Sequence, residues 1–161
     1  KGVWVAAKDA TQDEIVVARE QRDIYYQEYL KTKDLAINGV VSVLKKLSEK
    51  YKMAIVTTSR RVDFDIIHKN RDIVGFMDFV LCVEDYPKAK PHPDPYLMAL
   101  DKFGATKEQA IIVEDSQRGL ISANRAKIES VIVFNQFTQT QDFSTADHHI
   151  KKIDNLCDIL L

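Results

Sequence analysis

The stretch Ile111-Ile-Val-Glu-Asp-Ser116 places two carboxylates directly after a short apolar run, and it indicates how the chain folds. A run of this length is typical of a buried strand. Helical stretches separate it from similar runs at residues 53–56, 79–83 and 130–134. Strands that alternate with helices predict an α/β fold with a doubly wound parallel sheet. Ligands bind such sheets beyond the carboxyl ends of the strands, so the two carboxylates become candidate functional groups.

Helical patterns account for most of the remaining chain. Thr11 and Glu14 have the spacing of a capping box, which predicts a helix with one apolar face that continues to about residue 31. Further expected elements are a helix between Gly39 and Tyr51, a helix from Asp94 as N-cap to Gly104, an edge strand at 148–152 and a closing helical turn at 155–161.

Polar residues of three kinds stand at or near the ends of the predicted strands. Thr57 follows the first run, Lys90 precedes the third, and Glu114 and Asp115 end the third. A hydroxyl donor, a cation and a carboxylate pair suit phosphoryl transfer, which needs donors for the transferring oxygens and oxygen ligands for Mg²⁺. In a parallel sheet these positions can converge on one edge.

Three segments resemble the signature motifs of the haloacid dehalogenase superfamily, in its phosphatase and beta-phosphoglucomutase-like branch. Ala54-Ile-Val-Thr-Thr-Ser59 is similar to the second motif, Lys90-Pro-His-Pro-Asp94 to the third, and Ile111-Ile-Val-Glu-Asp-Ser-Gln-Arg-Gly119 to the fourth. Their order and intervals also match that family. The resemblance implies a Rossmann-like core over residues 35–161, preceded at residues 1–34 by the C-terminal part of a helical cap.

The resemblance also implies a role for each matching side chain. Thr57 would hydrogen-bond the phosphoryl oxygens, and Lys90 would neutralise the nucleophile and the phosphate together. Asp115, helped by Glu114, would hold Mg²⁺ directly or through water. The substrate would be a small phosphorylated metabolite, and two weaker candidates for contact with it are Ser59 and Arg60.

The first motif of that family, an apolar strand ending in Asp-x-Asp, is not found in this sequence. Asp63-Phe-Asp65 has the spacing but follows two arginines, and we expect it on a helix with Phe64 buried and both carboxylates solvated. The nucleophilic aspartate is therefore expected upstream of Lys1, and the 161-residue chain alone is expected to be inactive. A missing N-terminal segment or another chain would have to complete the core sheet, which lacks its first strand.

The implied activity is a Mg²⁺-dependent phosphohydrolase that works through an aspartyl-phosphate intermediate. A phosphomutase of the same superfamily and a non-catalytic module that binds phosphate and metal remain open alternatives. Dehalogenation is less consistent with the carboxylate pair of the fourth motif. A response-regulator receiver domain is excluded, because its acidic pair precedes its lysine along the chain.

Composition narrows the classes of partner. A net charge of −1 without a basic stripe argues against nucleic-acid binding, and no apolar run approaches the roughly 18 residues of a membrane span. Cys82 and Cys157 have no metal-ligand spacing, which favours free buried thiols and a cytoplasmic location.

Other conspicuous residues have simpler interpretations. Gly119 is expected near the start of a helix, outside any phosphate loop. The histidines at positions 92, 148 and 149 are expected on the surface, and the tyrosines at positions 25, 26 and 29 are expected to pack along their helix.

Overall fold

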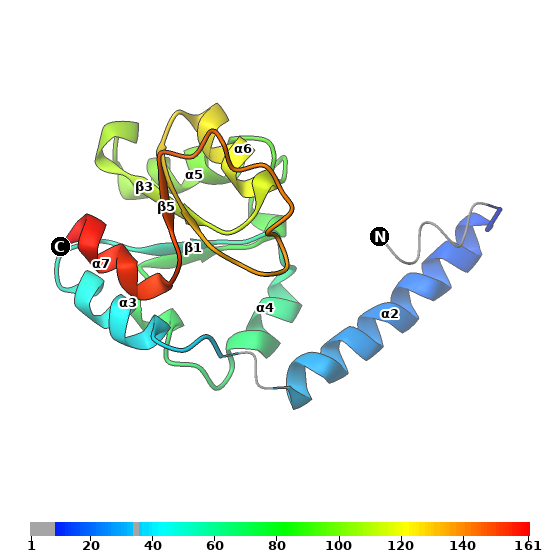
Figure 1. Cartoon of the computed structure of the whole chain (residues 1–161). Helices are drawn as coiled ribbons and strands as arrows, with labels where there is room; N and C mark the ends of the chain where they lie inside the picture. Colours follow the sequence, from blue (N-terminus) through cyan, green and yellow to red (C-terminus); the bar gives the residue numbers. More distant parts are fainter. Residues whose placement is uncertain (1–8, 34–35) are drawn as a thin grey trace.

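The computed structural model describes residues 9–33 and 36–161, and Figure 1 shows the arrangement of the elements. The helices are α2 (Gln12–Thr32), α3 (Val40–Ser48), α4 (Arg61–His68), α5 (Asp94–Phe103), α6 (Gln117–Ala126) and α7 (Leu156–Leu160). The strands are β1 (Ala54–Val56), β2 (Phe79–Leu81), β3 (Ile111–Glu114), β4 (Glu129–Val133) and β5 (His148–Ile150). None of the described helices combines the length and apolar character that crossing a membrane requires.

The predicted α/β alternation is confirmed, and every strand pair in the described residues is parallel. β1 pairs with β2 in one sheet, and β3, β4 and β5 form a second sheet in that order. β4 lies between two partners, and its central residue Val131 is fully buried. The β1–β2 connection includes α4 and the β3–β4 connection includes α6, as expected for parallel pairs, whereas β4 and β5 are joined by residues 134–147, which contain no helix.

Helices cover both faces of the larger sheet. Val43 and Leu47 of α3 and Leu156 of α7 pack with Val131 on one face, and Ile111 joins that cluster. The neighbouring residue of β3, Ile112, packs on the other face, with Tyr96 of α5 and with the alanines of α6. Adjacent β3 side chains thus enter opposite cores, as the two-residue period of a strand requires.

An apolar groove of about 910 Å³ separates the two sheets. All three residues of β1 line it, as do residues 111–113 of β3, and α3 and α5 close its flanks. In the described part of the chain, neither β1 nor β3 has a strand partner on the side of this groove. Val113 is accordingly 39% exposed, whereas Val131 of the doubly paired β4 is 0% exposed.

Helix α2 extends away from the body that contains the sheets and makes its most extensive contact with α4 (Figure 1). The predicted capping box is present, since the Thr11 hydroxyl accepts from the Glu14 backbone N–H and the Glu14 carboxylate accepts from the Thr11 backbone. The expected packing of the three tyrosines is wrong, because little of the described chain covers α2. Tyr25, Tyr26 and Tyr29 are 65%, 44% and 52% exposed, and Leu30 is the one buried residue that α2 contributes.

Two element boundaries differ slightly from expectation. Pro93 is the N-cap of α5 and Asp94 is its first residue. β2 ends at Leu81, because residues 83–85 form a 3₁₀ turn. The expected division between a cap and a core at residues 34 and 35 lies outside the described residues, so it stays a prediction.

The unpaired strand edges predict a specific pattern of amide hydrogen exchange in this chain. The Thr57 N–H bonds to the Leu81 carbonyl on the β2 side, so the preceding amide, that of Val56, points toward the groove. We expect the Val56 amide to exchange at least about ten-fold faster than the Ile132 amide of β4, measured by NMR. Equal protection of the two amides would show that the groove is already closed by another segment.

Candidate active site

Lys90 joins the carboxyl ends of β1 and β3 at one end of the groove. Its ammonium donates to the Val56 carbonyl oxygen at 2.9 Å and to Glu114 Oε1 at 2.5 Å. It also lies 4.6 Å from the centre of the Tyr96 ring, and both residues line the groove. The structure therefore brings the third and fourth sequence motifs into direct contact at the end of the first predicted strand.

The Lys90–Glu114 pair is buried, with side chains 8% and 9% exposed. Burial alone would raise the pKa of Glu114, but the charge of Lys90 and hydrogen bonds from Lys90, Tyr96 and Ser116 outweigh it and lower that pKa. Burial and the neighbouring Glu114 carboxylate raise the pKa of Tyr96, so its hydroxyl remains a donor to Glu114. The Glu114 carboxylate is thus held ionised next to an apolar space, where charges interact more strongly than they do in water.

Thr57 lies in the loop after β1, and its hydroxyl is half-buried. Its Oγ1 accepts from the Ser59 backbone N–H at 3.1 Å and donates to Ser59 Oγ at 3.2 Å. The Tyr86 hydroxyl donates to the Thr57 carbonyl at 2.6 Å, and burial raises the pKa of Tyr86 to about 12. Hydrogen bonds within the loop and from Tyr86 therefore fix the loop conformation. The Thr57 hydroxyl lies directly after β1 and is half-buried.

Of the two candidate metal ligands, the structure favours Asp115. Asp115 is exposed, and its Oδ2 accepts from Asn135 Nδ2 at 2.7 Å. Both oxygens of Glu114 accept hydrogen bonds, from Lys90 and Tyr96 on one and from Ser116 on the other. No group of three metal-binding side chains occurs among the described residues. Asp115 fits Mg²⁺ as a single carboxylate ligand, with the other oxygens coming from water, phosphate or another segment.

Gly119 in the first turn of α6 is needed because Glu114 occupies the space beside it. A β-carbon at this position would lie 2.0 Å from the Glu114 carboxyl carbon and 2.2 Å from each carboxylate oxygen. The helix start predicted for Gly119 is confirmed, and Ser116, not a carboxylate, is its N-cap. A small residue four positions after Asp115 is thus a packing requirement of the Lys90–Glu114 pair.

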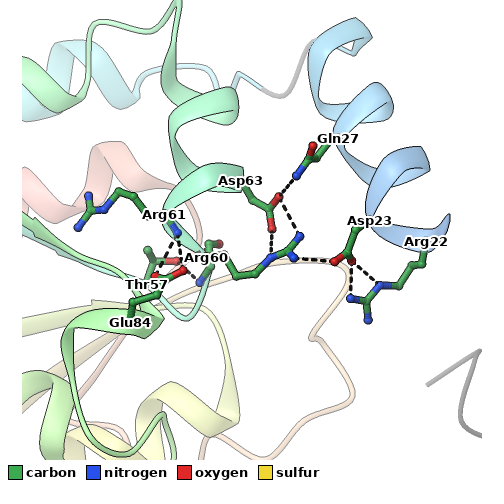
Figure 2. Close-up of polar contacts among 9 residues, drawn as sticks. Arg22, Asp23, Gln27, Thr57, Arg60, Arg61, Asp63 and Glu84 are labelled. Atoms are coloured by element: carbon green, nitrogen blue, oxygen red, sulfur yellow. Dashed lines mark hydrogen bonds and ion pairs between the residues drawn. The ribbon is translucent and has the colours of Figure 1, made fainter. Parts of the chain in front are cut away.

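Arg60 is directed toward α2, as Figure 2 shows. Its guanidinium donates to both carboxylate oxygens of Asp63, at 2.8 and 3.2 Å, and to Asp23 Oδ2 at 2.6 Å. Gln27 of α2 also donates to Asp63, at 3.0 Å. The expectation that Asp63 is solvated is wrong, because these groups from α2 and the loop cover it to 5% exposure. Substrate contact by Arg60 and Ser59 stays a prediction.

The structure adds contacts that the sequence did not reveal. Tyr96 and Tyr86 fix Glu114 and the Thr57 loop, but in sequence they are indistinguishable from ordinary core aromatics. Arg118 Nη2 donates to Thr58 Oγ1 at 3.1 Å and so bridges the second and fourth motifs. In the sequence, only the position of Arg118 three residues after Asp115 could have indicated this contact.

Gly119→Ala is expected to lower the free energy of unfolding by about 1–3 kcal/mol, because the added methyl must displace the buried Glu114 carboxylate. Urea denaturation of the chain measures the change. Gly75→Ala is the matched control, since nothing lies within 4 Å of a β-carbon there. Equal effects of the two substitutions would contradict the proposed packing role of Gly119.

Asp23→Ala is expected to loosen α2 without unfolding the core, because it removes the ion pair with Arg60 while the Arg60–Asp63 pair remains. The partly exposed pair should contribute less than about 1 kcal/mol to global stability. Hydrogen exchange of α2 amides should nevertheless accelerate relative to Glu20→Ala, an exposed change on the same helix. Unchanged α2 exchange would show that the Asp23–Arg60 ion pair does not hold this helix.

Comparison with known proteins agrees with this geometry. The sequence profile of the haloacid dehalogenase-like hydrolase family matches residues 5–133. A pyrophosphatase PpaX from Bacillus pumilus (strain SAFR-032) is 30% identical over 123 residues, which cover 73% of this chain and 53% of the relative. The crystal structure of a predicted phosphoglycolate phosphatase from Haemophilus somnus 129PT superposes with a TM-score of 0.88 at 25% identity, covering 97% of this chain and 71% of that one.

A second solved structure, CbbY from Rhodobacter sphaeroides in complex with phosphate, has a TM-score of 0.80 at 19% identity. The superposition covers 92% of this chain and 68% of the CbbY chain, and it supports the fold alone. The chain spans about half the length of the curated relatives it matches, with 56%, 55% and 45% for three of them. The family profile covers most of the sequence, and the chain therefore belongs to the haloacid dehalogenase-like hydrolase family.

Proposed function

We propose that this chain forms part of a Mg²⁺-dependent phosphohydrolase that acts on a small phosphate ester through an aspartyl-phosphate intermediate. One observation carries the proposal. Lys90 joins the ends of two parallel strands at the end of an apolar groove, with the Thr57 loop and Asp115 following those same strand ends. We infer that a cation, a hydroxyl and a carboxylate, the groups that phosphoryl transfer requires, are available at this end of the groove.

The groove is the proposed seat of the strand that carries the nucleophile. β1 and β3 both present unpaired edges to it, and Lys90 contacts the carboxyl ends of both, so we infer that one added strand could run parallel to both. A strand buried on both faces must be apolar, which matches the lining of the groove. We propose that polypeptide upstream of Lys1 supplies it, with its aspartate beside Lys90.

The side chains of this chain would then divide the work of binding and charge stabilisation. Lys90 would attract both the nucleophilic carboxylate and the phosphoryl group, and Glu114, its partner at 2.5 Å, would hold the ammonium in place. The Thr57 hydroxyl would turn from Ser59 and donate to a phosphoryl oxygen. The aspartate would attack phosphorus, the alcohol would leave, and water would then hydrolyse the acyl phosphate to regenerate the carboxylate.

Asp115 would contribute one carboxylate oxygen to Mg²⁺, which neutralises charge on the phosphoryl oxygens when bound. Glu114 would hold the Lys90 ammonium in position and would not itself contact the phosphoryl group. A phosphomutase and a non-catalytic phosphate-binding module remain alternatives. The mutase would return the phosphoryl group to its product, whereas the module would bind phosphate and Mg²⁺ without releasing product.

Lys90→Ala in the complete protein is expected to lower kcat by about 10²–10³, because it removes the charge that the transition state needs. Release of inorganic phosphate from small phosphate esters in Mg²⁺ measures it. Lys88→Ala, an exposed lysine of the same segment, is the control. Lys90→Met combined with Glu114→Gln leaves no unpaired buried charge and should also be inactive while folded. Near-normal turnover in a folded Lys90 variant would refute the assignment.

The 161-residue chain alone is expected to show no turnover, because the proposed nucleophile lies outside it. The intact mass of the natural protein under denaturing conditions tests this directly. A mass above 18.4 kDa together with Mg²⁺-dependent phosphate release would support the proposal. Turnover by a single species of 18.4 kDa would overturn it, since the nucleophile would then have to lie within this chain.

A further inference from the structure

The loop between β4 and β5 forms hydrogen bonds with several atoms of Asp115 and of the residues that follow it. The loop joins β4 to β5 over residues 134–147 and returns across the N-terminus of α6. Asn135 Nδ2 donates to Asp115 Oδ2 at 2.7 Å, and Thr138 Oγ1 donates to the Asp115 carbonyl oxygen at 2.6 Å. Gln141 Oε1 accepts from the Gln117 backbone N–H at 2.8 Å. Three side chains spaced three residues apart thus bind the segment that begins at Asp115.

The orientation of Asn135 is itself fixed. Its Oδ1 accepts from the Phe137 backbone N–H at 2.9 Å, so its NH₂ group is the end that faces Asp115. This matters because an amide presented the other way would set an oxygen against the carboxylate. The loop therefore presents a neutral donor to Asp115, which orients the carboxylate without cancelling its charge.

These contacts leave one polar atom of Asp115 available. Its N–H donates to Glu114 Oε2 at 3.3 Å, its carbonyl accepts from Thr138, and its Oδ2 accepts from Asn135. No hydrogen bond or ion pair to Oδ1 occurs among the described residues, and the residue is exposed. Asp115 is thus held at its backbone N–H, its carbonyl oxygen and one carboxylate oxygen, and its exposed second carboxylate oxygen is open to a metal ion.

We propose that Asn135 and Thr138 are positioning residues for the metal, which set the direction of Asp115 Oδ1. This inference rests on the proposed function, because it requires Asp115 to bind Mg²⁺. Hydrogen bonds to a ligating carboxylate restrict its rotamers and so reduce the entropy lost when the metal binds. Neither residue would touch the substrate.

The same loop provides a matched control. Asn124 Nδ2 of α6 donates to Thr145 Oγ1 at 2.7 Å, so this pair also joins the β4–β5 loop to α6 through one side-chain hydrogen bond. Among the described residues, neither member of this pair forms a hydrogen bond with Asp115. Asn124→Ala and Asn135→Ala therefore each remove one side-chain hydrogen bond of the β4–β5 loop, and only the second releases the Asp115 carboxylate.

The test is direct binding of Mn²⁺ to the complete protein, followed by electron paramagnetic resonance and independent of turnover. We expect Asn135→Ala to weaken Mn²⁺ binding by about 10-fold or more, and Asn124→Ala to leave it within about two-fold of the parent. Thr138→Val should weaken binding as well, whereas Thr138→Ser keeps the hydroxyl and should restore it. Thermal unfolding of each variant establishes that the fold is retained.

Three results would overturn the inference. Parent-like Mn²⁺ affinity in folded Asn135→Ala and Thr138→Val would show that the loop does not position Asp115. Equal weakening by Asn124→Ala would show that the loop acts only by general stabilisation. Failure of the parent protein to bind Mn²⁺ would overturn the metal role of Asp115 and with it this inference, which distinguishes that failure from the first two.

Discussion

The buried ion pair between Lys90 and Glu114 is the constraint on which the rest of the site depends. It spans the two sheets at their carboxyl ends, where the described strands share no hydrogen-bonded ladder. Removing one member would leave an unpaired buried charge, at a cost of about 3–5 kcal/mol. An apolar pair of equal size would stabilise the fold at least as well. The charge is therefore better explained by the chemistry it permits at the groove than by stability.

Several neighbouring features follow from this pair. Tyr96 places its ring on the ammonium and its hydroxyl on the carboxylate, so one aromatic side chain serves both charges. Gly119 is restricted to glycine by the volume of the Glu114 carboxylate, which in turn sets how closely α6 approaches β3. The groove supplies the low-polarity surroundings in which a fixed ammonium remains strong. The residues that pack around the Lys90–Glu114 pair therefore also determine the electrostatics of the site.

The sequence predicted the elements better than it predicted the contacts between them. Four apolar runs located β1 to β4, and Thr57 and Glu114 stand at the ends of two of these runs, because a strand end is a local property that spacing reveals. The edge strand expected at residues 148–152 is β5, and Lys90 was indicated by the motif around it. Asp63 was misjudged because its burial depends on Arg60 and on Gln27, which is 36 residues away in sequence. The exposure of Tyr25 is likewise set by what packs against α2, and no periodicity within the helix reports that.

Glu114 and Asp115 are adjacent in sequence and chemically similar, yet the fold gives them different environments. Glu114 is 9% exposed and accepts four hydrogen bonds from side-chain or backbone donors, so its negative charge is stabilised by groups within the protein. Asp115 is exposed, and its neutral partners Asn135 and Thr138 leave its charge uncompensated. Because consecutive residues at a strand end face opposite directions, one carboxylate faces inward to Lys90 and the other faces outward to the solvent. An acidic pair at this position thus supplies an internal counter-charge and an exposed, uncompensated carboxylate, which two carboxylates on the same face could not do without repelling each other.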